Sequence, residues 1–173
     1  EPLQREWSDE QFLWLERFPL PTLAALSGEV AGHALDLALS CDIRVAGESA
    51  ELRFRTIGTR RMMQLLGIER SVGVLEARGR ADATAALRLG LVSHVTPEAG
   101  LDAYVEKLAS TIAARGPIAT RLAKEAIWRG LGLPLEQALR FETDLTLLLQ
   151  TTKDRAEGVR AFLEKRTPQF TGK

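Results

Sequence analysis

The sequence predicts an α/β domain followed by a region made only of helices. Short apolar runs that suit strands alternate with helical patterns through residues 20–113, and glycine or proline bounds them. From Pro117 onward, helical patterns follow one another with no strand between them. The 173 residues are 45% hydrophobic, enough for a packed core. We therefore expect an α/β core over residues 1–115 and a helical region over residues 116–173.

The first expected element is a helix over residues 9–17. Ser8 and Gln11 have the spacing of a capping box, in which side chains satisfy backbone N–H groups at a helix start. Pro19 is expected to end this helix, because proline removes a backbone donor and clashes with the preceding turn.

The next segment is expected to form a strand, a turn, a helix and a second strand. Residues 22–26 and 43–46 are short apolar runs, and Ser27–Gly28 is typical of a turn. Residues 32–40 are apolar on nearly all sides, which predicts a helix in the core. Asp36 interrupts this helix one turn from its start. Because aspartate is rarely buried unless it is paired or functional, Asp36 is a candidate for either role.

The rest of the core follows from the same rules. A helix is expected over residues 58–66, with Gly67 as its stop. Further elements are helices near 71–77, 82–89 and 101–113 and a strand over 91–95. His94 lies in that apolar strand and is expected to be a hydrogen-bonded histidine of the core.

Three amphipathic helices are expected after the core. Proline marks the start of two of them, at Pro117 and Pro134, and the last runs over about residues 154–165. Their apolar stripes need a partner surface.

Composition narrows the classes of partner. The formal net charge is zero, so there is no electrostatic case for nucleic acid or an anionic membrane surface. The single cysteine, Cys41, is expected to be a small core residue in a reducing compartment. The apolar runs are too short for a bilayer, the first residues are acidic and polar and do not predict a signal peptide, and no metal-ligand spacing is found. We expect a cytoplasmic protein without a metal, a nucleic-acid partner or a membrane partner.

A known pattern runs through the segment that contains Asp36. Its matching residues are Pro21, Ala24, Ala25, Gly28, Gly32, Leu37, Ala38, Cys41, Asp42, Arg44 and Ala46. Further blocks follow in order over residues 59–67, 85–92, 117–126 and 154–173. In these positions the sequence resembles the crotonase superfamily, the enoyl-CoA hydratases and isomerases, from about Pro19 to the C-terminus.

The resemblance implies an α/β, crotonase-like spiral of ββα units, incomplete here, with a C-terminal helical oligomerisation region. It implies an enzyme that acts on an acyl-CoA thioester through an oxyanion-stabilised enolate. The implied assembly is a homotrimer or a dimer of trimers. Coenzyme A enters as part of the substrate, and no separate cofactor is expected.

The resemblance also implies an oxyanion site at the start of the helix over residues 32–40. In the family, a backbone N–H in a run of three glycines holds the thioester oxygen and so stabilises the enolate. Here that position is His33, between Gly32 and Ala34, and any residue except proline can donate this N–H. Gly32 and His33 are thus the candidate oxyanion and substrate-binding residues. The His33 imidazole is also a candidate base; alternatively it faces solvent or a cleft without a role.

Two further roles are carried over from the family. Asp36 stands where the family has its first catalytic glutamate, and a carboxylate there can move a proton to or from the substrate or its water. Alternatively, Asp36 caps or pairs within the core. Lys165 matches a position that contacts CoA from a neighbouring subunit in some members. Alternatively, Lys165 is a solvated lysine near a helix C-terminus, where its charge suits the helix dipole.

Two parts of the family pattern have no counterpart. The loop with the second catalytic glutamate is absent, and the nearest carboxylate, Glu51, is expected to be a solvated charge at a strand edge. The opening strands, with the other oxyanion donor, are also missing before Pro19. The chain is expected to be a C-terminal fragment, a truncated paralogue or a sequence with segments left out. A second hypothesis follows, a non-catalytic acyl-CoA-binding or scaffold subunit that assembles with other subunits.

Overall fold

The computed structural model describes residues 14–15, 17–54, 59–76 and 78–173, without the side chains of 59–61. The chain forms two compact units. Unit 1 holds residues 1–18 and 22–107, and unit 2 holds residues 19–21 and 108–173. The capping box at Ser8 and most of the helix expected over residues 9–17 lie outside the described residues. Of that helix, Trp14 and Leu15 are helical.

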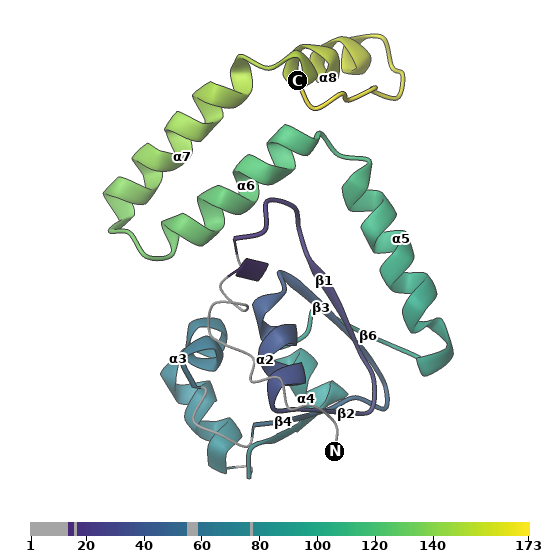
Figure 1. The fold of residues 1–173 in the computed structure, drawn as a ribbon, viewed down its shortest axis with the longest axis vertical. Coiled ribbons are helices and arrows are strands. Elements are labelled where there is room, and N and C mark those ends of the chain that lie inside the picture. Colours follow the sequence, from purple (N-terminus) through teal and green to yellow (C-terminus); the bar gives the residue numbers. More distant parts are fainter. Residues whose placement is uncertain (1–13, 16, 55–58, 77) are drawn as a thin grey trace. The chain divides into compact units, whose positions relative to one another are not determined.

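A three-stranded parallel sheet forms one part of unit 1 (Figure 1). Its strands are β1 (Leu23–Leu26), β3 (Ile43–Gly47) and β6 (His94–Thr96), in the order β1-β3-β6. Leu23 pairs with Ile43, and Val45 pairs with His94. The strand expected over residues 22–26 and the one expected over residues 43–46 are confirmed. β6 begins three residues later than the strand expected over 91–95 and shares only residues 94 and 95 with it.

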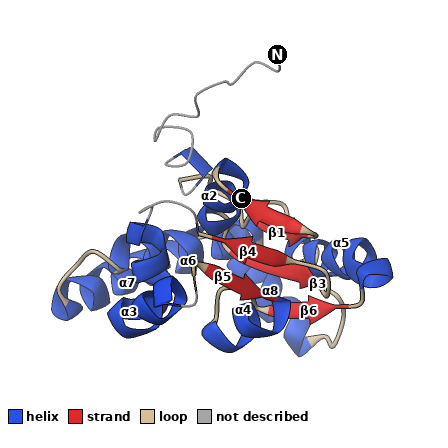
Figure 2. Cartoon of the chain, turned by 90° about the horizontal axis from the view of Figure 1, so that it is seen from below, coloured by secondary structure: helices blue, strands red, loops and turns tan. Residues whose placement is uncertain are grey.

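A second sheet is built from strands of three residues each, which the sequence did not predict. These are β2 (Glu29–Ala31), β4 (Glu51–Arg53) and β5 (Arg80–Asp82), in the order β2-β4-β5. Figure 2 shows β4 and β5 side by side. β2 pairs with β4 in parallel, and β4 pairs with β5 in antiparallel orientation. On this sheet Val30, Leu52 and Ala81 are buried.

The helices of unit 1 follow the strands. They are α2 (His33–Ser40), α3 (Thr59–Glu76), α4 (Ala83–Leu89) and α5 (Leu101–Ala113), with a short 3₁₀ turn over Glu98–Gly100 before α5. α5 continues into unit 2. The predicted helix stop at Gly67 is confirmed, because Gly67 leaves helical geometry with φ 74° and ψ 174°. Beyond this kink a second helical stretch of α3 runs to Glu76, where a helix near residues 71–77 was expected.

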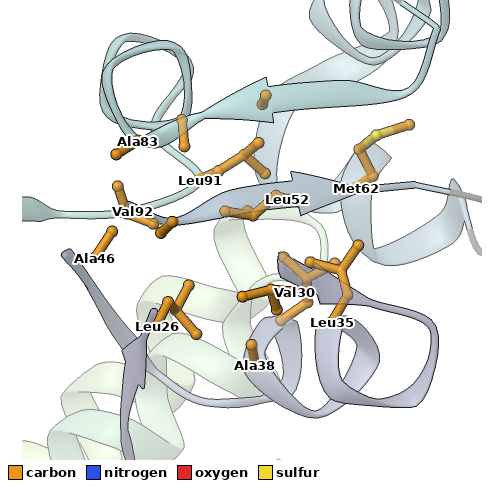
Figure 3. Close-up of a cluster of buried hydrophobic side chains, with 14 of the residues drawn as sticks. Leu26, Val30, Leu35, Ala38, Ala46, Leu52, Met62, Ala83, Leu91 and Val92 are labelled. Carbon is orange, nitrogen blue, oxygen red and sulfur yellow. The ribbon is translucent and has the colours of Figure 1, made fainter. Parts of the chain in front are cut away.

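The core of unit 1 lies where these elements meet. Its largest fully buried side chains include Leu52, Met62 and Leu91. Figure 3 shows Leu35 and Ala38 of α2 facing strand residues such as Val30. Cys41 is buried, as expected for a small core residue.

Unit 2 is helical, as the sequence predicts. α6 (Pro117–Gly130) packs along α7 (Leu135–Gln150), and α8 (Lys153–Leu163) follows. Pro117 occupies the first turn of α6, where its missing N–H is not needed. The buried Lys124 on α6 donates a hydrogen bond from Nζ to the carbonyl oxygen of Leu20, at 3.0 Å.

Two carboxylates on α8 bind the chain that follows this helix. Asp154 is buried and accepts hydrogen bonds from the backbone N–H groups of Thr171 and Gly172, at 2.7 and 2.9 Å. Glu157 accepts two bonds from the Arg166 guanidinium, at 2.5 and 3.0 Å, and one from the backbone N–H of Gln169. The residues after α8 are therefore folded back onto it.

The Glu157 contact predicts a dependence of stability on pH. The hydrogen bonds from Arg166 and from the backbone of Gln169 lower the pKa of Glu157 from its ordinary 4.5 to about 2. A lowered folded-state pKa adds stability at neutral pH, and that stability is lost as the pH falls from about 4.5 through about 2. Glu157→Gln is therefore expected to be less stable than the natural chain at pH 7. The difference should shrink below pH 4.5.

Urea unfolding of both proteins across this pH range tests the expectation. The control is Glu136→Gln, since Glu136 is exposed and its ion pair with Arg140 lies within one helix. Such exposed pairs contribute little, so this control should lose little stability. If Glu157→Gln is less stable than the natural chain by the same free energy at pH 3 as at pH 7, the charge of the Glu157 carboxylate is not what binds the residues after α8.

Candidate functional site

The candidate site is the start of α2. β2 ends at Ala31, and Gly32 then takes φ 55° and ψ −133°, in the region that favours glycine. A Cβ on Gly32 would meet no atom within 4 Å, so the backbone conformation, and not crowding, favours glycine here. No side chain caps the helix at Gly32.

This arrangement presents backbone donors to the outside. The first N–H groups of an α-helix have no acceptor within the helix, and the positive end of the helix dipole lies beside them. Gly32, His33 and Ala34 are all exposed. The start of α2 therefore suits an oxygen that carries negative charge.

Asp36 lies one turn into α2. Its backbone N–H donates to the carbonyl oxygen of Gly32, at 3.1 Å, and its own carbonyl accepts from Ser40 Oγ, at 2.6 Å. The residue is half-buried, whereas Leu35, Ala38, Leu39 and Ser40 are buried. Among the described residues, no hydrogen bond or ion pair engages the Asp36 carboxylate. The structure thus brings Gly32, His33 and Asp36 together on one helical turn, and their roles stay predictions.

The fourth predicted residue, Lys165, lies in unit 2. It follows α8, is exposed and has φ 53°, which is uncommon for a residue with a side chain. Its predicted contact with CoA stays a prediction.

Two expectations about other residues are wrong. Glu51 does not lie on an edge strand, because β4 is the central strand of its sheet; its side chain is 36% exposed and pairs with Arg53 at 2.9 Å and Arg80 at 3.7 Å. His94 is not a core histidine. It is exposed and stacks on Tyr104, with ring centroids 5.0 Å apart.

A polar cluster missed by sequence reasoning follows the ends of β1 and β3. The Glu98 carboxylate accepts hydrogen bonds from the hydroxyl groups of Ser27 and Ser49, the latter at 2.7 Å. These bonds hold the pKa of Glu98 below its usual value. A Cβ on Gly47 would overlap the same carboxylate. The cluster ties the two strand ends to the 3₁₀ turn, which is a structural role.

Metal ligands do not gather in the described part of the chain. No group of three or more His, Cys, Asp or Glu residues there could hold a metal ion. None of the helices within the described ranges has the length and apolar character that a membrane span requires.

Fold and site together define a class: an α/β protein in which a strand leads through a glycine into an exposed helix start. The family model "Enoyl-CoA hydratase/isomerase" matches residues 3–173. The chain belongs to this family of enzymes, and the crotonase resemblance is confirmed.

Individual relatives agree with the family assignment. The chain is 36% identical over 172 residues to 2,3-dehydroadipyl-CoA hydratase of Escherichia coli, covering 93% of this chain and 68% of that protein. It is 38% identical over 169 residues to human enoyl-CoA hydratase domain-containing protein 2, mitochondrial, covering 90% and 58%. The crystal structure of enoyl-CoA hydratase from Bacillus anthracis superposes with a TM-score of 0.90 at 36% identity, covering 97% of this chain and 73% of that one.

The chain is shorter than these relatives. It spans 64% and 62% of the length of two further curated relatives, from Bacillus subtilis and Mycosarcoma maydis. The family and the crotonase fold are thus established, and the reaction is a matter for proposal.

Proposed function

We propose that this protein acts on an acyl-CoA thioester by stabilising an enolate at the start of α2. The observation that carries the proposal is the exposed, glycine-started helix with a half-buried carboxylate one turn along. The thioester oxygen accepts the His33 N–H, and the helix dipole favours the negative charge that develops there. Family membership supports the same class of substrate.

Asp36 is the proposed proton carrier. Its carboxylate removes a proton from the carbon next to the thioester carbonyl, and the electron pair of the broken C–H bond shifts to form the enolate. Asp36, now protonated, returns the proton to the same carbon or to another carbon of the conjugated system. The first outcome is exchange, and the second moves the double bond. Both need one carboxylate and no added co-reactant.

The proposal extends to what surrounds the site. CoA is the carrier part of the substrate, and Lys165 contacts the phosphates of the CoA bound to a neighbouring subunit. The protein works as a trimer or a dimer of trimers in the cytoplasm. Native mass spectrometry with and without an acyl-CoA would test the assembly and the number of ligands bound per subunit.

The decisive experiment follows the proton. The protein is incubated in D₂O with a saturated acyl-CoA and, separately, with a β,γ-unsaturated one. Deuterium at the carbon next to the carbonyl is measured by mass spectrometry, and hydration of an α,β-unsaturated acyl-CoA is measured in parallel. We expect deuterium uptake or double-bond movement well above the rate without protein. A folded protein that gives neither would contradict the proposal and favour a scaffold role.

A further inference from the structure

Arg44 is a buried cation at the far end of α2 from the candidate site. It lies on β3, the central strand of its sheet, and is 7% exposed. Its Nη1 donates to the carbonyl oxygens of Cys41, at 2.5 Å, and Ala38, at 3.4 Å. Cys41 is the C-cap of α2, and Ala38 belongs to its last turn. The guanidinium therefore closes the C-terminal end of this helix.

The same side chain reaches a third segment. Arg44 Nε donates to the carbonyl oxygen of Leu91, at 2.6 Å. The carbonyl oxygen of Arg44 accepts from the backbone N–H and from the hydroxyl of Ser93, both at 2.9 Å. Side chain and main chain of Arg44 thus join β3, the end of α2 and the segment that leads into β6.

Arg44 shares this end of α2 with two local donors: the Cys41 backbone N–H donates to the carbonyl oxygen of Ala38, at 3.2 Å, and Ser40 Oγ donates to that of Asp36, at 2.6 Å. α2 has no basic residue in its last turn, and Cys41 is extended, not in the left-handed conformation that commonly ends helices. The last carbonyl groups of a helix carry partial negative charge and lack partners within the helix. Arg44 supplies the charge and further donors. Burial lowers the pKa of Arg44, but guanidinium remains charged in proteins, so the contact is permanent at ordinary pH.

A short helix turns a small tilt into a displacement at its other end. With eight residues, α2 is about 12 Å long at about 1.5 Å per residue. A tilt of about 5° at Arg44 would therefore move the start of α2 by about 1 Å, and a misplacement of about that size can cost about 100-fold in rate.

We propose that Arg44 is a positioning residue for the chemistry at the start of α2. By fixing the C-terminal end of the helix to the segment at Leu91, it sets where the His33 N–H and the Asp36 carboxylate stand. This inference rests on the proposed function.

The test compares three variants of the protein. Arg44→Met keeps an apolar stem and removes all donors, and Arg44→Lys keeps the charge but not the planar fork that reaches several carbonyl groups. The control, Asp82→Ala, removes the N-cap of α4, where Asp82 Oδ1 accepts from the Ala85 N–H at 2.7 Å. It should lower stability without touching α2.

The expected result is a split between kcat and KM. At a temperature where all variants are folded, kcat for α-proton exchange should fall at least about 10-fold in Arg44→Met, and KM should change less than about 3-fold. Arg44→Lys should lie between Arg44→Met and the natural chain. Asp82→Ala should keep its kcat. If kcat of both Arg44 variants equals that of the control, the inference is overturned.

A second measurement does not depend on turnover. Hydrogen exchange of the α2 backbone should be faster in Arg44→Lys than in the natural chain, and unchanged in Asp82→Ala. This measurement decides the matter where Arg44→Met does not fold. If the natural chain shows no turnover, the proposed function fails, while faster exchange in α2 would still support the anchoring role. Unchanged exchange in Arg44→Lys would refute that role.

Discussion

Replacing Asp36 by asparagine is expected to lower the rate of α-proton exchange on an acyl-CoA by about 10²- to 10⁴-fold, the usual contribution of a positioned acid–base group. The amide has the same shape but cannot take up the proton. The backbone N–H groups of α2 remain, so acyl-CoA binding should change little. Folding stability should also change little, because no hydrogen bond or ion pair among the described residues engages this carboxylate.

The comparison variants for this experiment are Asp102→Asn and Asp36→Glu. Asp102 is an exposed carboxylate in the first turn of α5, so its loss should leave the exchange rate unchanged. Asp36→Glu keeps a proton carrier and should retain activity. If the natural chain is active and Asp36→Asn exchanges protons at the same rate, Asp36 is not the proton carrier.

The second large effect is expected at Gly79. Gly79 has φ 66°, and a Cβ there would overlap the carbonyl oxygen of Phe54. The Gly79 N–H donates to the carbonyl oxygen of Val74, and its own carbonyl accepts from the Phe54 N–H, at 2.9 and 2.8 Å, so the backbone is held on both sides. Gly79→Ala is therefore expected to destabilise unit 1 by about 2 kcal/mol or more, from the left-handed conformation and the forced separation of backbone atoms.

A matched glycine provides the control. Gly73 lies within α3, and a Cβ there would meet nothing within 4 Å. Alanine is the better helix former by up to about 1 kcal/mol, so Gly73→Ala should be neutral or stabilising. Urea midpoints of the two variants, followed by circular dichroism, make the comparison. Equal urea midpoints would mean that the backbone at Phe54 can shift away from the added Cβ at little cost in stability.

Helices were the easiest elements to predict. Apolar stripes with a period near 3.6, bounded by proline and glycine, placed α5 at its observed ends and began α6 at Pro117. Gly67 correctly indicated the break in α3, because its φ of 74° lies in the region that favours glycine and a kink separates the two helical stretches there.

The short strands could not be predicted in the same way. β2, β4 and β5 have three residues each, too few for an alternating pattern to stand out. Their partners are distant in sequence, so the central position of β4, and with it the pairing of Glu51, depends on tertiary structure. The exposure of His94 could not be predicted either, because an apolar run does not reveal which of its side chains the rest of the fold leaves uncovered.

In the candidate site, too, the features that are local in sequence could be predicted and those that depend on distant residues could not. Gly32, His33 and Asp36 are local in sequence, so their shared helical turn could be predicted once the helix was placed. Arg44 is different. Its partners at Ala38 and Cys41 are close in sequence, but Leu91 is not, and an arginine within an apolar strand gives no sign of which carbonyl groups it meets.

The register of β3 with β6 also affects how the chain reaches its native state. Val45 pairs with His94, so β3 and β6 can pair only after the chain between these two residues has closed into a loop. Contacts between distant residues form slowly, because the entropy of closing the loop is lost before pairing compensates for it. The consecutive helices of unit 2 meet neighbours in sequence and should form earlier. During refolding, β3 is therefore expected to remain open on one side for some time, when pairing with another chain competes with β6.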